Sequence, residues 1–237
     1  MSGDPLIGQQ FGNFRLVRRL GEGAMGTVYE ATHVRIDHRA AVKVLHAEFA
    51  QDAEFASRFL NEAKAVNIIQ HPGLVSIFDF GQREDGSLFI VMEYLRGRTL
   101  SELVRSAPRG LPMEQAVELM HQLALAIAAA HEKGVIHRDV KPSNIILMDD
   151  SLMTGSLRLK VLDFGIAKLN GQEPGSALPP SSSDNTGFGR MLGTPMYMAP
   201  EQYGAAAEVT GKADVFATDA VFFELYTGQP PDRKSVV

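Results

Sequence analysis

The chain has 237 residues, of which 45% are apolar and 22% charged, and its formal net charge is −5. These values are ordinary for a soluble globular protein with one large domain or two small ones. The acidic balance argues against a general nucleic-acid binder. The absence of cysteine excludes disulfides, thiolate zinc sites and cysteine nucleophiles. The N-terminus lacks the pattern of a signal peptide, and the most apolar stretch, residues 123–130, is too short to span a bilayer.

The first hundred residues are predicted to form mostly strands. Runs of apolar and β-branched residues predict strands at 14–23, 26–33, 39–45, 74–80 and 88–94. Helical spacing of apolar residues predicts one helix over 53–70, which stops before the breaker sequence His-Pro-Gly.

The remainder is predicted to be mainly helical. A long helix covers 113–134 and ends at Gly134, a typical C-terminal cap. Short strand-like pieces follow at 144–147 and 157–164. Residues 170–189 are rich in Gly, Pro and Ser and are interpreted as a mobile loop. This change of character along the chain predicts two lobes with a cleft between them.

The stretch GEGAMGTV at 21–28 contains the spacing G-x-G-x-x-G. In dinucleotide-binding folds such a loop opens a helix, whereas here a predicted strand follows. Lys43 lies in the next strand. A glycine hairpin folded over phosphates, with a lysine beside it, favours nucleoside triphosphate binding over the alternative, a dinucleotide-dependent oxidoreductase.

The stretch HRDVKPSN at 137–144 concentrates several chemically capable groups. A carboxylate (Asp139) beside a cation (Lys141) suits phosphoryl transfer, which depends on positioning and charge neutralisation. Asn144 and Asp163 supply oxygen donors of the kind that Mg²⁺ prefers.

Seven motifs in one order carry a resemblance to a known family. They are GEGAMGTV, AAVK, LNEAKAV, MEYL, HRDVKPSN, DFG and GTPMYMAPE, and the resemblance covers roughly residues 14–228. With them the chain resembles the bacterial eukaryotic-type (Hanks-type) serine/threonine protein kinases. The resemblance implies an α+β bilobal protein-kinase fold. A small lobe of antiparallel β-sheet with one helix would precede a mainly helical large lobe.

The resemblance also implies a binding site for ATP. The adenine would be enclosed by Leu20, Val28, Ala41 and Ile146. Met92 would be the gatekeeper residue, and the adenine edge would bind to the backbone of Glu93 and Leu95. The loop over the phosphates would comprise Gly21, Glu22, Gly23, Ala24, Met25, Gly26 and Thr27.

Roles in transfer follow in the same way. Lys43 would hold the α- and β-phosphates and be fixed by Glu62. Asp139 would accept the proton of the substrate hydroxyl or orient that hydroxyl, and Lys141 would stabilise the transferring phosphoryl group. Asn144 and Asp163 would bind Mg²⁺. His137 and Phe164, with Val66 and Ile77, would form a stacked apolar column.

Regulation would depend on the segment from Asp163 to Glu201. In the family, an arginine at the position of Arg138 pairs with a phosphorylated segment. We therefore expect autophosphorylation among Ser181, Ser182, Ser183 and Thr186, with Thr186 favoured, and self-association for this reaction. Thr194 would be a structural contact to Asp139 and Lys141. The expected substrates are Ser and Thr hydroxyls of proteins.

The resemblance also indicates domain boundaries. They are an N-terminal extension at 1–13, a small lobe at 14–95, a large lobe truncated at 96–231 and an unrelated tail at 232–237. One back-translation of the tail resembles a sequencing adapter, so we hypothesise a read-through artefact and a longer natural protein. An alternative function for the truncated chain is nucleotide binding without efficient transfer. The expected location is the cytoplasm, although a longer gene product could be membrane-anchored.

The stretch DVFATDAVFFELYTG at 214–228 departs from the family pattern at Asp219, where a small or apolar residue is usual. A buried, unpaired carboxylate there would be costly. Truncation would also expose an apolar face of this helix. The candidates for exposure are Phe222, Phe223, Leu225 and Tyr226.

Overall fold

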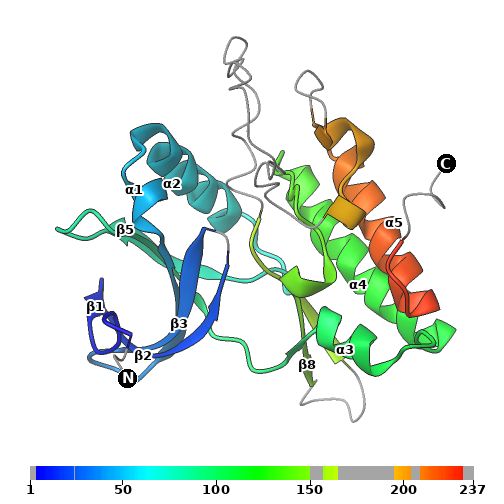
Figure 1. Cartoon of the computed structure of the whole chain (residues 1–237), viewed down its shortest axis with the longest axis horizontal. Coiled ribbons are helices and arrows are strands. Elements are labelled where there is room, and N and C mark those ends of the chain that lie inside the picture. The colour runs from blue at the N-terminus through cyan, green and yellow to red at the C-terminus, as the bar shows by residue number, and fades with distance from the viewer. Residues whose placement is uncertain (1–3, 24, 150–156, 165–194, 204–208, 232–237) are drawn as a thin grey trace, which may run out of the picture.

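The structure is a computed structural model that describes residues 4–23, 25–149, 157–164, 195–203 and 209–231. It forms two lobes, a β-sheet lobe from the first part of the chain and a helical lobe from the rest (Figure 1).

A six-stranded antiparallel sheet, in the order β1-β2-β3-β4-β6-β5, forms the small lobe. Its strands are β1 (Gln10–Phe11), β2 (Phe14–Glu22), β3 (Gly26–His33), β4 (Arg39–Leu45), β5 (Ile77–Gln82) and β6 (Leu88–Glu93). The five strands expected from the sequence are confirmed. β1 was not predicted, because two residues carry no periodicity.

Alternation along β4 determines what lies on each face of this sheet. Ala40, Val42 and Val44 belong to an outer core, which includes the fully buried Phe11. Ala41 and Leu45 point to the opposite face and join a second core with residues of α2 (Ala53–Asn67). Because side chains alternate along a strand, Lys43 emerges on this second face. The single-turn helix α1 (Ala47–Ala50) precedes α2.

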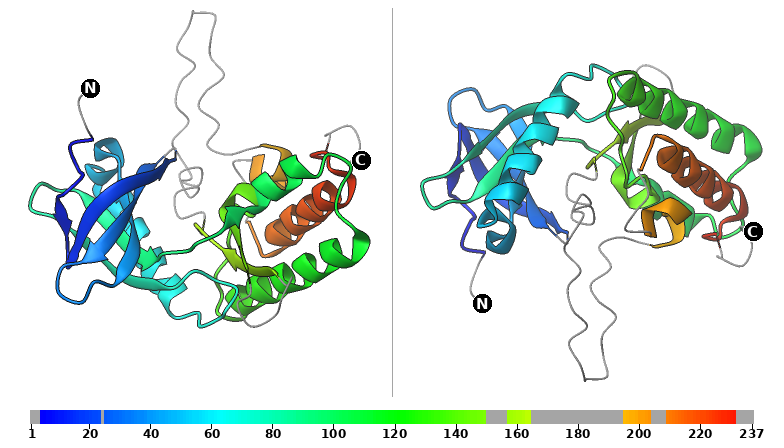
Figure 2. Two further views of the ribbon diagram at one scale, coloured as in Figure 1. Left: turned by 90° about the horizontal axis from the view of Figure 1, so that it is seen from below. Right: turned by 90° about the horizontal axis from the view of Figure 1, so that it is seen from above.

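The large lobe is built around two long helices, α4 and α5, which lie side by side (Figure 2). Its helices are α3 (Leu100–Ser106), α4 (Met113–Glu132) and α5 (Lys212–Thr227), with short 3₁₀ turns η1 (Pro142–Asn144), η2 (Pro195–Tyr197) and η3 (Pro200–Tyr203). A small sheet joins β7 (Arg98–Thr99), β8 (Ile145–Asp149) and β9 (Leu157–Val161). Thr99 and Glu102 begin α3 with a reciprocal capping box.

The lobes are joined by more than the connecting chain. The segment between α2 and β5 lies against β9, where the backbone N–H of Val75 donates to the Val161 carbonyl at 3.0 Å. Lys160 of β9 reaches the same segment and also β6, since its Nζ lies 3.2 Å from the Leu74 carbonyl and 2.5 Å from Glu93 Oε2. These contacts fix the cleft-facing end of β9, which leads directly to Asp163. No helix within the described residues is long and apolar enough to cross a membrane.

Candidate active site

The glycine-rich stretch forms the turn between β2 and β3. The backbone N–H of Gly23 donates to the carbonyl of Gly26 at 2.9 Å and narrows the turn. Gly26 is required by packing, because a Cβ there would lie 2.3 Å from the Val44 carbonyl oxygen. A Cβ on Gly21 would meet nothing within 4 Å. Protein packing therefore explains Gly26 but not Gly21, which would permit an external group to approach the backbone.

Lys43 projects from β4 toward the other lobe. Its Nζ forms an ion pair with Asp163 Oδ1 at 2.9 Å. A pocket is lined by both residues together with the predicted gatekeeper Met92 and the column residues Val66, Ile77 and Phe164. The side chain of Glu62, the predicted partner of Lys43, lies outside the described part of α2.

The residues predicted to enclose adenine come from both lobes. Ala41 and Met92 are cross-strand partners in β4 and β6, both are buried, and Val28 and Leu95 pack against the same core. Ile146 lies in β8 of the other lobe, and Leu20 is exposed near the end of β2. The backbone N–H of Glu93 donates to the Ser76 carbonyl at 2.9 Å, so this atom is engaged within the protein.

The loop at 137–144 brings together three side chains predicted to act in transfer. Lys141 Nζ lies 2.8 Å from Asp139 Oδ2. Asn144 Nδ2 donates to the same oxygen at 3.0 Å and to the Asp139 carbonyl at 2.9 Å. A carboxylate is thus held between a cation and an amide, which fixes its direction.

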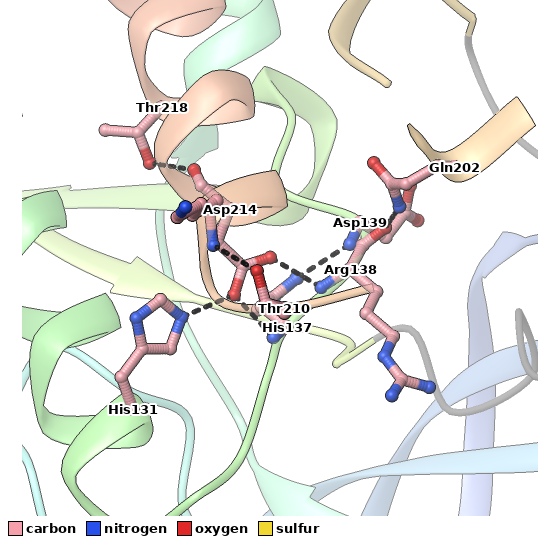
Figure 3. Close-up of polar contacts among 9 residues, drawn as sticks. His131, His137, Arg138, Asp139, Gln202, Thr210, Asp214 and Thr218 are labelled. Atoms are coloured by element: carbon pink, nitrogen blue, oxygen red, sulfur yellow. Dashed lines mark hydrogen bonds and ion pairs between the residues drawn. The ribbon is translucent and has the colours of Figure 1, made fainter. Parts of the chain in front are cut away.

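A buried carboxylate of α5 accepts hydrogen bonds from the backbone of this loop (Figure 3). Asp214 is fully buried and accepts three hydrogen bonds. They come from the backbone N–H groups of His137 and Arg138 and from His131 Nε2, each at 2.7 Å. Arg138 has a φ of +63°, a left-handed conformation that costs a non-glycine residue free energy. The bonds to Asp214 stabilise that conformation.

His137 connects the loop to the strand that bears Asp163. Its Nδ1 accepts the backbone N–H of Asp139 at 3.2 Å, so its Nε2 must carry the proton that binds the Leu162 carbonyl at 2.8 Å. Its ring lies 4.6 Å from that of Phe164. Burial lowers the pKa of His137, although Asp214 and other carboxylates oppose this effect. His137 is therefore a neutral, packed side chain.

Residues 195–203 pack on α5 and on the loop. The Tyr197 hydroxyl donates to the carboxylate of Glu224, and burial raises the pKa of both groups. Gln202 donates from Nε2 to the Arg138 carbonyl at 3.1 Å. The predicted regulatory residues Ser181, Ser182, Ser183, Thr186 and Thr194 lie outside the described residues, as does Ala24 of the glycine-rich turn.

Sequence reasoning missed several residues that shape this site. They are His131, Gln202, Asp214, Glu224 and Lys160. Helical periodicity could have found Asp214, because it shares a buried face of α5 with Ala217, Val221 and Leu225. The contacts of Gln202 and Lys160 join segments that are far apart in the sequence, and no local pattern marks them.

In this structure a lysine of the β-sheet lobe pairs with a carboxylate of the helical lobe, and a loop of the helical lobe carries Asp, Lys and Asn. This is the arrangement of protein kinases. The chain belongs to the family described as "Protein kinase domain", whose sequence model matches residues 14–236.

Named relatives agree with this assignment. The chain is 43% identical to serine/threonine-protein kinase Pkn1 of Myxococcus xanthus over 230 residues, which cover 96% of this chain and 31% of that protein. It is 39% identical to serine/threonine-protein kinase PrkC of Bacillus subtilis (strain 168), covering 98% of this chain and 33% of that protein. It therefore spans about a third of the length of these curated relatives.

A solved structure agrees as well. The crystal structure of the Mycobacterium tuberculosis PknI kinase domain matches with a TM-score of 0.72 at 31% identity. The match covers 98% of this chain and 81% of that one. The predicted bilobal kinase fold is confirmed.

Proposed function

We propose that this chain is a serine/threonine protein kinase domain, which transfers the γ-phosphoryl group of ATP to Ser and Thr hydroxyls of proteins. The observation that supports it most strongly is the contact of Asp139 with Lys141 and Asn144 at 2.8–3.0 Å. Lys43 and Asp163 form a second charged pair, at 2.9 Å, between the two lobes. Specificity for Ser and Thr is supported by the stretch KPSN at 141–144 and by the named relatives.

The proposed roles follow from the charges that the site brings together. Asp139 carries a carboxylate that can orient a hydroxyl and accept its proton. The ammonium of Lys141 beside it can stabilise negative charge on the transferring group, and Lys43 can hold the α- and β-phosphates. Phosphoryl transfer needs positioned charge more than covalent catalysis, and these residues supply such charge.

Asn144 and Asp163 are the side chains that would hold Mg²⁺. An amide oxygen and a carboxylate are hard oxygen donors, and Mg²⁺ in kinases typically takes few protein ligands, with water and phosphates completing its shell. Asn144 uses its amide nitrogen to bind Asp139, which directs its oxygen elsewhere. When bound, Mg²⁺ would neutralise phosphate charge.

Activation would involve phosphorylation of the segment between Asp163 and Glu201. Arg138 is the proposed partner of the phosphate, since its left-handed backbone lies next to Asp139 and a guanidinium binds phosphate strongly. Ser181, Ser182, Ser183 and Thr186 are the proposed acceptors, and one copy of the chain would phosphorylate another. Phosphopeptide mapping of an active preparation should find phosphate in this group, and a bare segment would refute the idea.

A phosphorylation assay tests the proposed activity. The chain should label a generic Ser/Thr substrate with ATP and Mg²⁺, and Asp139→Asn should lower kcat by about 100-fold or more because it removes the proton acceptor. Asp219→Asn makes the same chemical change at an exposed site and should retain activity. Equal labelling by wild type and Asp139→Asn would contradict the proposal.

A thermal melt with and without ATP separates binding from transfer. A ligand that prefers the folded state raises Tm by mass action. A rise in Tm without substrate labelling would assign nucleotide binding without efficient transfer, which is the alternative raised by the sequence.

A further inference from the structure

Gln202 joins two parts of the site through the two ends of one side-chain amide, and Figure 3 shows it beside Arg138. Its Oε1 accepts the backbone N–H of Ala199 at 3.0 Å, within its own segment. Its Nε2 donates to the carbonyl of Arg138 at 3.1 Å, 64 positions earlier in the chain. Only a side chain with both an acceptor and a donor at this spacing can make both bonds, and glutamine has them.

The bonded carbonyl belongs to the peptide unit that immediately precedes Asp139. The N–H of that unit donates to His137 Nδ1 at 3.2 Å, while its C=O accepts from Gln202. Since a peptide unit is planar, bonds at both ends fix its rotation and so the direction in which the Asp139 side chain leaves the backbone.

The same peptide unit follows a residue with an unfavourable conformation. Arg138 has φ +63°, and such a conformation persists only where its surroundings determine it. Asp214 of α5 binds the N–H of Arg138 at 2.7 Å, and Gln202 binds its C=O. The two ends of the residue are thus held by side chains from different elements.

Gln202 lies directly after Glu201, where the segment that begins at Asp163 ends. Its 3₁₀ turn, η3, is seated next to Tyr197, whose hydroxyl binds Glu224 of α5. α5 therefore binds both the loop at 137–144 and residues 195–203. Asp214 is hydrogen-bonded to the loop, and Glu224 is hydrogen-bonded to Tyr197. The amide of Gln202 closes the connection between them.

We propose that Gln202 is a positioning residue for Asp139, which makes the direction of this carboxylate depend on how residues 195–203 are seated. The inference rests on the proposed function only where it predicts an effect on the rate of phosphoryl transfer. The coupling between segment and loop is a structural property that can be measured without any activity.

The test compares Gln202→Glu with Gln122→Glu. Gln122 of α4 is a matched control, because its Nε2 donates to the Leu157 carbonyl and its Oε1 accepts the Leu159 N–H, each at 2.9 Å. In both variants a carboxylate keeps the acceptor and loses the donor. Only Gln202 contacts the loop that bears Asp139.

Amide hydrogen exchange of residues 137–144 is the first measurement. Gln202→Glu should speed exchange there by about tenfold, the factor for losing a hydrogen bond worth about 1.4 kcal/mol. Gln122→Glu should leave this segment at the wild-type rate. Unchanged exchange at 137–144 in Gln202→Glu, or an equal change in both variants, would overturn the proposal. If Gln202→Glu does not fold, Gln202→Met and Gln122→Met provide a matched comparison in which both the donor and the acceptor are removed.

Steady-state kinetics are the second measurement. Gln202→Glu should lower kcat by about 10- to 100-fold while KM for ATP stays the same, because misplacement of Asp139 affects the chemical step. Its kcat relative to Gln122→Glu should recover between pH 7.5 and 5.5, since a protonated carboxyl can again donate to the Arg138 carbonyl. A merely structural role predicts equal kcat losses in both variants and no such recovery. Inactive wild type would count against the proposed function, and the exchange experiment would still decide the role of Gln202.

Discussion

At the scale of residues, the two aspartates of α5 have opposite environments. The sequence drew attention to Asp219, which departs from the family pattern, but this residue is exposed. The buried aspartate is Asp214, which accepts hydrogen bonds from the loop that bears Asp139 and from His131 of α4. The cost of a buried, unpaired carboxylate therefore does not arise at Asp219, because this residue is not buried. At Asp214, the hydrogen bonds offset the cost of burial.

Asp214→Asn should destabilise the protein. An asparagine presents one NH₂ group where the carboxylate has an acceptor, so at least one buried N–H loses its partner, at a cost of about 1–3 kcal/mol. Urea denaturation measures this loss. Asp219→Asn on the same helix should change the free energy of unfolding by less than about 0.5 kcal/mol. Equal effects of the two substitutions would contradict the role given to Asp214.

His137 should make stability depend on pH. Burial lowers its pKa below the usual 6.5, so the unfolded chain binds a proton more readily than the folded one. The contribution of His137 is complete above pH 6.5 and is lost as pH falls through the lowered pKa. The free energy of unfolding changes with pH by at most the uptake of one proton, which is about 1.4 kcal/mol per pH unit.

Urea denaturation at pH 7.5, 6.5 and 5.5 checks this expectation. His137→Gln should remove this part of the slope below pH 6.5, whereas His121→Gln, at an exposed position of α4, should keep it. Identical slopes in wild type and His137→Gln would show that the histidine is not buried in its neutral form.

At the scale of elements, the loop between α3 and α4 meets the end of α5 by close backbone contact. Gly110 has φ +80°, and a Cβ there would lie 1.9 Å from the Tyr226 carbonyl oxygen. The adjacent Leu111 N–H donates to the Leu225 carbonyl at 2.7 Å. Glycine is needed at this position for its conformation and for the approach of α5.

Gly110→Ala and Gly86→Ala separate these two requirements. Gly86 has φ +84° and nothing within 4 Å of a built Cβ, so its substitution costs only the left-handed conformation, about 1–2 kcal/mol. Gly110→Ala should cost about 1–3 kcal/mol more, because the carbonyl of Tyr226 must move. The two Tm values and urea midpoints measure the difference. Similar losses would indicate that α5 adjusts freely.

Elements with strong periodicity were predicted well from the sequence. β4 was expected at 39–45 and occurs at Arg39–Leu45, and the helix expected at 113–134 is α4, Met113–Glu132. α3 was missed, because it has seven residues and only one turn of buried positions. The exposed apolar face of α5 was predicted in part. Phe223 and Tyr226 are exposed, while Leu225 is 1% exposed and the prediction for it was wrong.

At the scale of the whole molecule, two ion pairs cross from one lobe to the other. Lys43 binds Asp163 in the cleft, and Lys160 binds Glu93 behind it. Lys160 also donates to the Leu74 carbonyl, so one cation joins β9, the end of β6 and the segment between α2 and β5. This second pair is only partly exposed and should be weakly screened by salt.

Lys160→Met should weaken the contact between the two lobes at β9. Hydrogen exchange of Val75, whose N–H binds the carbonyl next to Lys160, should become about tenfold faster, because a charge-assisted bond of about 1.5–3 kcal/mol is lost. Lys133→Met, at an exposed lysine after α4, should leave Val75 unchanged. An unchanged rate in Lys160→Met would show that the backbone bonds alone hold the lobes together.

The sequence by itself determined the lobes, the strands with clear alternation and the residue types of the site. Its motifs also predict that one functional group contains Lys43, Asp139, Lys141, Asn144 and Asp163. These properties are local, because periodicity and motif spacing are written within short stretches of chain. Only the tertiary structure decided which aspartate of α5 is buried, that Gln202 holds the peptide before Asp139, and that Lys160 joins the lobes. Each of these depends on a contact between distant segments, and such contacts form only when the packed core brings the segments together.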